Sequence, residues 1–143
     1  MPKQPKSLVF WCERITVPTP YFGLCLTEEA FKRELKRLKH TEAVDWITGG
    51  ASATVHTFES DDSTETVCVV CLDGRQALKR SETEIVGMLF HEAVHIWQGI
   101  VRVMREQQPS DEFEAYTIQR IGQALYWTWL EWKKKQRKKK TTR

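Results

Sequence analysis

Two histidines and a glutamate are spaced as metal-assisted hydrolysis requires. His91, Glu92 and His95 spell H-E-x-x-H inside a strongly helical stretch, residues 81–105. Residues four apart lie on one face of an α-helix, so both imidazoles can bind a single Zn²⁺ ion. Glu92 lies about 100° further round the helix, where its carboxylate can hold a water on the metal without becoming a ligand. The pattern therefore predicts a zinc site that activates water for hydrolysis.

The residues around the motif predict the helix that positions it. Ser81 and Glu84 form an S-x-x-E capping box at its start. Apolar residues then recur at helical spacing and form a stripe for the core: Ile85, Leu89, Ala93, Ile96, Ile100 and Val103. The two histidines lie on a different, polar face, near Gly87 and Gly99. These glycines indicate either the close approach of a substrate or metal, or tight packing against another helix.

A third ligand is expected from the next helix. Pro109 and Ser110 predict a turn and an N-cap, followed by acidic residues in a first helical turn. Because the preceding loop is short, the two helices should fold back as neighbours. Glu112, seventeen positions after His95, could then complete a three-ligand site and leave the fourth position to water. Glu114 is the competing ligand, or else a solvent-exposed acid of the first turn.

In these residues the chain resembles the gluzincin metallopeptidases, in which H-E-x-x-H is followed by a glutamate in an E-x-x-A-D or E-x-x-A-N context. The matching glutamate begins the segment Glu112 to Tyr116, and the resemblance covers residues 82–123. It implies a zinc-dependent peptidase that acts on peptide or protein substrates, with Glu92 as the catalytic base. The zinc ligands that it implies are His91, His95 and Glu112. The same segment also looks like small, uncharacterised zinc-peptidase-like proteins of bacteria and phages.

Tyr116 departs from the family pattern, because it stands where many gluzincins have an Asp or Asn that orients a ligand histidine. A tyrosine could instead hydrogen-bond the developing oxyanion, as Tyr126 or Arg120 could, or it could only pack. Tyr116 is therefore a candidate catalytic residue beside Glu92.

The rest of the chain predicts one zincin-like α+β domain over residues 1–132, with a small antiparallel sheet packed on the motif helix and the ligand-bearing helix after it. The expected strands are residues 8–17, 53–58 and 66–72, the last two as a hairpin. A helix is expected from Thr27 to about Leu38, and a helical turn or loop at residues 43–47. In the zinc peptidases that the chain resembles, an edge strand above the motif helix pairs with an extended substrate backbone. The resemblance therefore implies this role for one of the two hairpin strands, and the alternative is that either is an ordinary interior strand.

Cys68 and Cys71 have the spacing of a metal or redox motif, but the residues around them favour a strand. Residues three apart on a strand point to opposite faces and cannot share one metal. A thioredoxin-type pair would lie at the start of a helix. We therefore expect all four cysteines (Cys12 and Cys25 are the others) to be buried small hydrophobes, with a structural zinc bound by all four as the alternative.

Charge is unevenly distributed along the chain. Residues 133–143 hold eight basic residues and no acids, and the remaining 14 basic against 19 acidic residues give the body a charge of −5. The basic run is expected to be a flexible, frayed helix end; the alternative is a nonspecific contact with nucleic-acid phosphates or an assembly partner. No N-terminal apolar run resembles a secretory signal, and the apolar segment 124–132 is too short to span a membrane. The expected location is the cytoplasm.

Three functions of different classes therefore compete. One is a nucleic-acid accessory protein that binds through the basic run of residues 133–143, and truncation after Trp132 would then abolish binding. Of the other two, the first is a zinc peptidase. The second is a catalytically inactive zincin-like module that binds or assembles with a partner, and in which zinc is structural or absent. Only the enzyme would lose activity when Glu92 loses its carboxylate.

Overall fold

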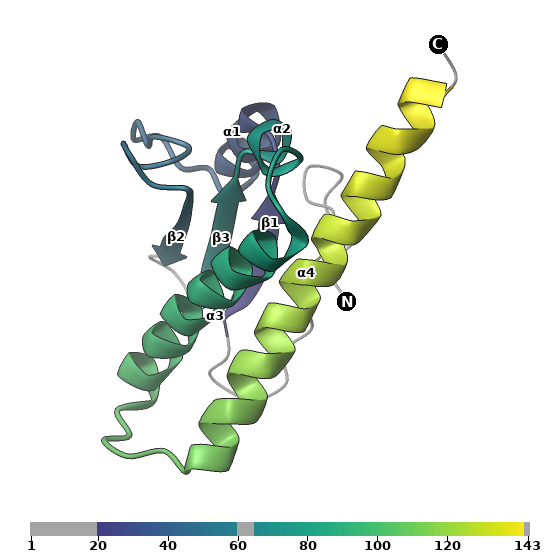
Figure 1. Ribbon diagram of the computed structural model, residues 1–143. Helices are drawn as coiled ribbons and strands as arrows, with labels where there is room; N and C mark the ends of the chain where they lie inside the picture. The colour runs from purple at the N-terminus through teal and green to yellow at the C-terminus, as the bar shows by residue number, and fades with distance from the viewer. Residues whose placement is uncertain (1–19, 60–64, 142–143) are drawn as a thin grey trace.

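A three-stranded sheet lies at the centre of the computed structural model, which describes residues 20–59 and 65–141 (Figure 1). Its strands are β1 (Tyr21–Cys25), β2 (Ala53–Glu59) and β3 (Thr66–Leu72). The helices are α1 (Glu28–Arg37), α2 (Gly74–Ala77), α3 (Glu82–Met104) and α4 (Asp111–Thr141). The two hairpin strands are confirmed, whereas the strand expected at residues 8–17 lies outside the described residues.

The sheet is mixed, so the prediction of an antiparallel sheet was wrong, although the α+β class is confirmed. The strand order is β1-β3-β2, with β3 antiparallel to β2 and parallel to β1. The parallel pair arises because α1 and β2 lie between β1 and β3 in the chain and supply the long crossover that such a pair needs. Among the described strands β3 is therefore central, and β2 is an edge strand.

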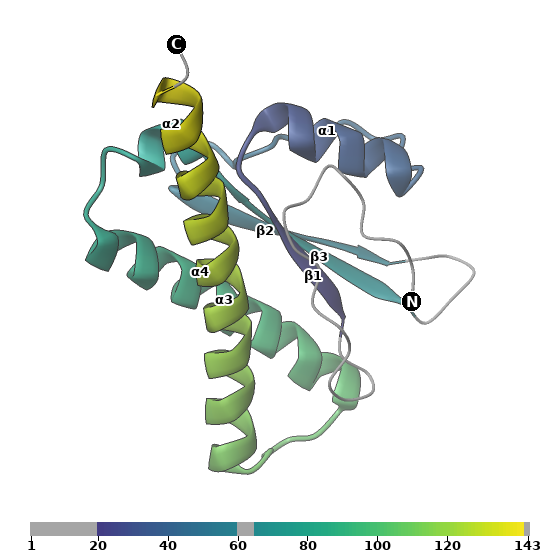
Figure 2. The same ribbon diagram turned by 90° about the vertical axis from the view of Figure 1, so that its right-hand side faces the viewer.

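Different helices cover the two faces of the sheet. α3 and α4 lie on one face and α1 lies on the other (Figures 1 and 2). Alternate residues of β3 belong to the two separate cores: Cys68 and Val70 pack on the side of α3 and α4, whereas Val69 and Cys71 pack on the side of α1. The central strand is thus buried on both faces and fixes both layers of helices.

The cysteines of β3 confirm the interpretation as buried hydrophobes. Cys68 and Cys71 point to opposite faces, and Cys25 is buried beside Cys71 on the adjacent strand. Burial raises the pKa of the Cys68 thiol to about 11 and raises the pKa of Cys71 as well. Both thiols are therefore protonated at neutral pH, which suits neither a metal ligand nor a nucleophile. Cys12 lies outside the described residues.

Capping side chains begin α1 and α3 at the residues where the sequence predicts these helices to start. α1 follows Thr27, whose hydroxyl accepts a hydrogen bond of 3.1 Å from the Ala30 N–H. α3 follows Ser81, whose N–H donates to Glu84 Oε2 at 2.8 Å while the Glu84 N–H donates to Ser81 Oγ at 3.3 Å. Each cap satisfies N–H groups that a helix start leaves unpaired, which stabilises a helix by about 1 kcal/mol.

α4 is a continuous helix of 31 residues that runs through the basic segment to Thr141. It passes the boundary after Trp132 that the sequence suggests between domain and tail. Lysine, arginine and glutamine favour helix, and positive side chains are favourable near the negative C-terminal end of a helix. Within the described residues, no helix is both long and apolar enough to cross a membrane.

α3 and α4 approach each other closely at Gly122. A Cβ atom at this position would lie 2.6 Å from the Phe90 ring, which is inside the normal contact distance. A Cβ atom at Gly99 of α3 would meet only the guanidinium of Arg102, at 3.9 Å. The two helical glycines therefore differ in what they permit: Gly122 is required by packing, and Gly99 is not.

Gly122→Ala should destabilise the protein by about 1–3 kcal/mol, because the added methyl group overpacks the helix interface. Gly99→Ala should stabilise it by up to about 1 kcal/mol, since alanine favours helix more than glycine does. Urea unfolding of both variants measures the contrast. Equal stabilisation by the two substitutions would contradict the packing of α3 on α4 described above.

Candidate metal centre

The surroundings of α3 separate its residues into distinct faces. Phe90 and Trp97 face α4, where the Phe113 ring centroid lies 5.4 Å from that of Trp97. Aliphatic residues of α3 face the sheet and are buried. His91 and His95 are exposed on a third face. At 100° per residue, the two histidines lie about 100–160° around the helix from the side that packs on α4.

The two imidazoles converge on one point. Nε2 of His91 lies 3.1 Å from Nε2 of His95, and the ring planes are nearly perpendicular. Nδ1 of His95 donates to Gln98 Oε1 at 3.1 Å, which fixes the tautomer and leaves the His95 Nε2 lone pair directed toward His91. Two imidazole nitrogens that converge in this way have the arrangement of two of the four ligands in a tetrahedral zinc site.

Glu92 lies beside the histidines but is buried. Its side chain is 5 % exposed, and within the described residues its carboxylate has no hydrogen-bonding partner. Burial raises the pKa of this carboxyl group, while the nearby His91 and His95 oppose the increase. A carboxylate that is shielded from bulk solvent and not held by a protein donor can bind a water and accept its proton.

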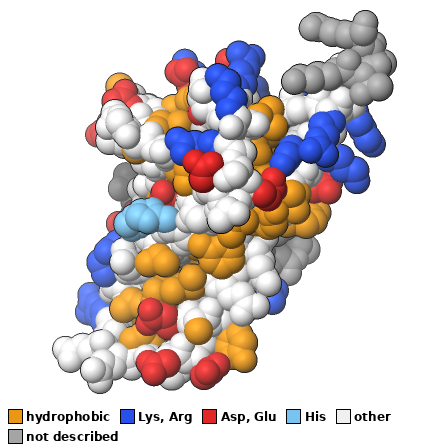
Figure 3. All heavy atoms as spheres, viewed as in Figure 1, with side chains coloured by type: hydrophobic (Ala, Val, Ile, Leu, Met, Phe, Trp, Pro, Cys, Tyr) orange, Lys and Arg blue, Asp and Glu red, His pale blue; other side chains and the backbone are white. Residues whose placement is uncertain are grey.

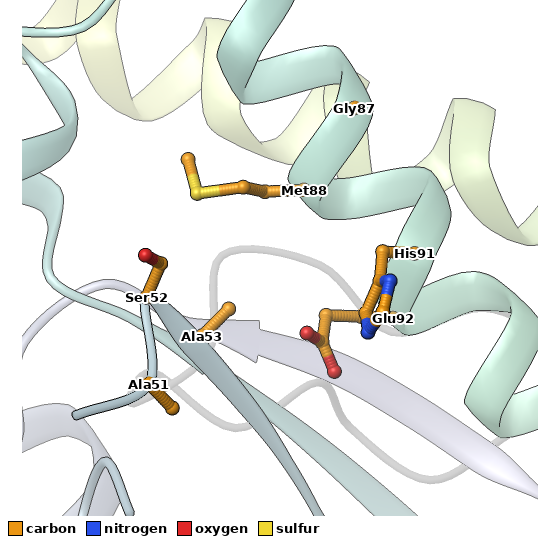
Figure 4. A pocket seen from close by; sticks show the side chains of 7 residues that line it. All are labelled: Ala51, Ser52, Ala53, Gly87, Met88, His91 and Glu92. Atoms are coloured by element: carbon orange, nitrogen blue, oxygen red, sulfur yellow. The ribbon is translucent and has the colours of Figure 1, made fainter. Parts of the chain in front are cut away.

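A pocket of about 440 Å³ opens beside these residues, between α3 and the start of β2. α3 contributes one wall and residues 51–53 contribute the other (Figure 4). The carboxylate of Glu92 and the side chain of Met88 point from α3 toward the start of β2. His91 also lines the pocket. The candidate base and one candidate ligand therefore share a space that is large enough for part of a peptide.

The predicted third ligand does not form a metal-binding group with His91 and His95. Glu112 and Glu114 are exposed in the first turn of α4. Across residues 20–59 and 65–141, no group of three or more His, Cys, Asp or Glu side chains is arranged to hold a metal ion. The reason is the face on which α4 packs, because it contacts α3 through Phe90 and Trp97 and not on the histidine side.

The candidate oxyanion donors also lie elsewhere. Tyr116 is 66 % exposed on α4 and is not among the residues that line the pocket. The Tyr126 hydroxyl donates to Glu82 Oε1 at 3.0 Å, and the Lys133 ammonium group also contacts Glu82, at 2.5 Å. Tyr126 therefore joins α4 to the start of α3. Arg120 is exposed and does not line the pocket either.

Sequence reasoning missed one wall of the pocket. Ala51, Ser52 and Ala53 carry no chemical pattern, and only the suggestion that a hairpin strand could bind substrate pointed to this part of the chain. Gly87 was noticed, and the structure excludes tight helix packing as the reason for this glycine. A Cβ atom at Gly87 would meet nothing within 4 Å, and the residue lines the pocket. Open space, not helix packing, therefore surrounds Gly87.

Glu112→Ala should leave zinc affinity within about threefold of the wild-type value, a change of less than 1 kcal/mol. The expectation follows from the exposed position of Glu112 on a helix that packs away from the histidines. Competition with a chromogenic chelator measures the affinity, with Glu114→Ala as the matched control. A loss of 100-fold or more for Glu112→Ala alone would show that α4 rearranges to supply this carboxylate.

No protein-family model matches the chain, and no curated protein or solved structure is significantly similar to it. The side chains of α3 and the pocket beside β2 are therefore the features that bear on function.

Proposed function

We propose that this protein is a zinc-dependent peptidase whose centre is formed by His91, Glu92 and His95. The observation that carries the proposal is the convergence of two exposed imidazole nitrogens, 3.1 Å apart, beside a buried carboxylate. His91 and His95 fit as two of the protein ligands of a zinc ion, because Nε2 atoms are common zinc ligands and Gln98 holds the His95 ring through its other nitrogen.

Each side chain has a separate role in the proposed reaction. His91 and His95 would hold the ion, and Gln98 would keep the His95 ring oriented. Zinc, when bound, supplies a Lewis acid that polarises the scissile carbonyl and acidifies water. Glu92 would accept a proton from the attacking water and pass it to the leaving amine. The raised pKa of this buried carboxyl group favours both halves of that transfer, since an efficient acid–base group has a pKa near the working pH.

β2 is the proposed binding strand for the substrate. The sequence left both hairpin strands open, but β3 is paired on both sides and is therefore excluded. β2 is paired with β3 alone among the described strands, and its first residue, Ala53, lines the pocket with His91 and Glu92. An extended peptide added along this edge would gain main-chain hydrogen bonds and place a peptide bond near the Glu92 carboxylate.

Zinc-dependent cleavage of a mixture of fluorescence-quenched peptides tests the proposal. Protein freed of metal by a chelator and then dialysed should be inactive, and one equivalent of Zn²⁺ should restore cleavage. Products identified by mass spectrometry should result from hydrolysis of internal peptide bonds. Absence of cleavage by the zinc-loaded protein, or cleavage that a chelator does not affect, would contradict a zinc peptidase.

A second candidate is an inactive module that uses the same pocket to bind a partner. The observation that favours it is the missing third ligand: catalytic zinc sites usually have three protein ligands, and the described residues bring only two together. This protein would bind zinc and peptides without cleaving them. Peptide binding that is measurable by anisotropy and unchanged in Glu92→Gln, with no cleavage by either protein, would support the module.

A further inference from the structure

The C-terminal part of α4 carries a dense positive charge that the metal centre does not use. The basic end of α4, residues 133–140, contains seven basic residues and one glutamine. Core packing stops before it, because Trp129 is the last buried residue of the helix and Trp132 is only half-buried. Lys134, Lys135 and Lys139 are exposed. Figures 1 and 2 show the helix extending past the sheet, and Figure 3 shows basic side chains gathered over it.

These lysines form one side of the helix. At 100° per residue, Lys134, Lys135 and Lys139 fall within an arc of about 140°, and Lys133 lies roughly opposite. Lys133 faces the body of the protein and pairs with Glu82, which anchors the start of the basic end. In the part of the chain that the structure describes, none of the three other lysines forms an ion pair. Lys134, Lys135 and Lys139 are therefore exposed cations on an anchored helix.

Like charges on successive turns repel, by about 0.2–0.5 kcal/mol for each pair. Packing does not require these residues. Residues 1–132 carry a net charge of −5, so the net positive charge of the chain lies in its C-terminal segment. A surface of this kind attracts a polyanion and turns the acidic body away from it. The partner that fits must therefore present closely spaced negative charges.

We propose that the basic end of α4 binds the phosphate backbone of double-stranded nucleic acid. A helix of about 10–12 Å diameter can lie along the roughly 12 Å wide major groove of a duplex, with lysines directed at phosphates on its rim. Residues 133–140 contain no aromatic side chain, so stacking on unpaired bases is not available there. They also contain no apolar face of the kind that an amphipathic helix inserts at a membrane surface. The contact is to phosphates and independent of base sequence.

Fluorescence anisotropy with a labelled 20-base-pair duplex of arbitrary sequence tests this proposal on the full chain. Affinity should fall steeply with salt, and each lysine that contacts a phosphate should contribute about 0.9 to the slope of log K against log salt. Replacing Lys134, Lys135 and Lys139 together with glutamine should therefore make the slope shallower by about 2.7. Glutamine and lysine have similar helix propensities, so circular dichroism should show an unchanged helix content.

The control removes three exposed lysines from α1 and the turn after it, with Lys32, Lys36 and Lys39 replaced by glutamine. This variant should retain the wild-type slope, as should His95→Ala, because the metal centre takes no part. Equal weakening by the two triple variants would mean that net charge, and not α4, determines binding, and would overturn the proposal. So would wild-type duplex binding that does not depend on salt, or tighter binding to phosphatidylserine-containing vesicles than to the duplex at the same ionic strength.

Discussion

Glu92→Gln should lower kcat/KM for a cleaved peptide by about 10²- to 10⁴-fold, the usual contribution of a positioned general base. Glutamine has nearly the same size and shape as glutamate, but it cannot accept a proton from water. The side chain is not expected to bind the metal, so zinc affinity should stay close to the wild-type value. The effect should therefore appear in turnover and not in metal content.

Loss of fold cannot account for such a result. Glu92 is 5 % exposed and its carboxyl pKa is raised by burial, which means that the folded protein disfavours the ionised form. A neutral amide removes that penalty, so the melting temperature should be unchanged or higher. Glu29→Gln, an exposed change in α1, serves as the matched control and should keep full activity. If Glu92→Gln cleaved peptides as fast as the wild type, Glu92 would not be the base.

The elements closest to the motif could be predicted because local signals agree there. The capping box at Ser81 and the apolar stripe of α3 both indicate a helix with the same start and the same buried face. The hairpin of β2 and β3 follows from β-branched residues, and the opposite directions of Cys68 and Cys71 follow from strand spacing alone. In each case the structure is determined by residues within a few positions in the chain.

The mixed sheet and the position of α4 could not be predicted in this way. β1 is short and contains Gly23 and Cys25, so its own sequence gives a weak strand signal, and its parallel pairing depends on residues more than forty positions away. The seventeen-residue spacing from His95 to Glu112 predicts that two helices are neighbours, but not which faces meet. Two residues of α4 determine which face of α3 it contacts. Gly122 leaves room for the Phe90 ring, and Phe113 packs on Trp97.

His95→Ala should weaken zinc binding by about 100-fold or more. Loss of a group that only orients a zinc ligand lowers affinity about 10- to 100-fold, so loss of the ligand itself should have at least the larger effect. His95 is exposed and contributes nothing to the buried core, hence the variant should unfold at the wild-type temperature. Competition with a chromogenic chelator gives the affinity, and the metal content of the purified protein gives the stoichiometry.

Two further alanine substitutions on the same face of α3 test whether the loss of zinc affinity comes from the His95 ligand itself. Gln98→Ala keeps both imidazoles but removes the oxygen that accepts from His95 Nδ1, so its loss of affinity should fall between the wild type and His95→Ala. Arg102→Ala shortens an exposed side chain one turn beyond Gln98 and should leave zinc affinity unchanged. This graded order is expected only if the metal lies between the two Nε2 atoms. Equal affinities for His95→Ala and Arg102→Ala would place any bound zinc elsewhere and remove the basis of the catalytic proposal.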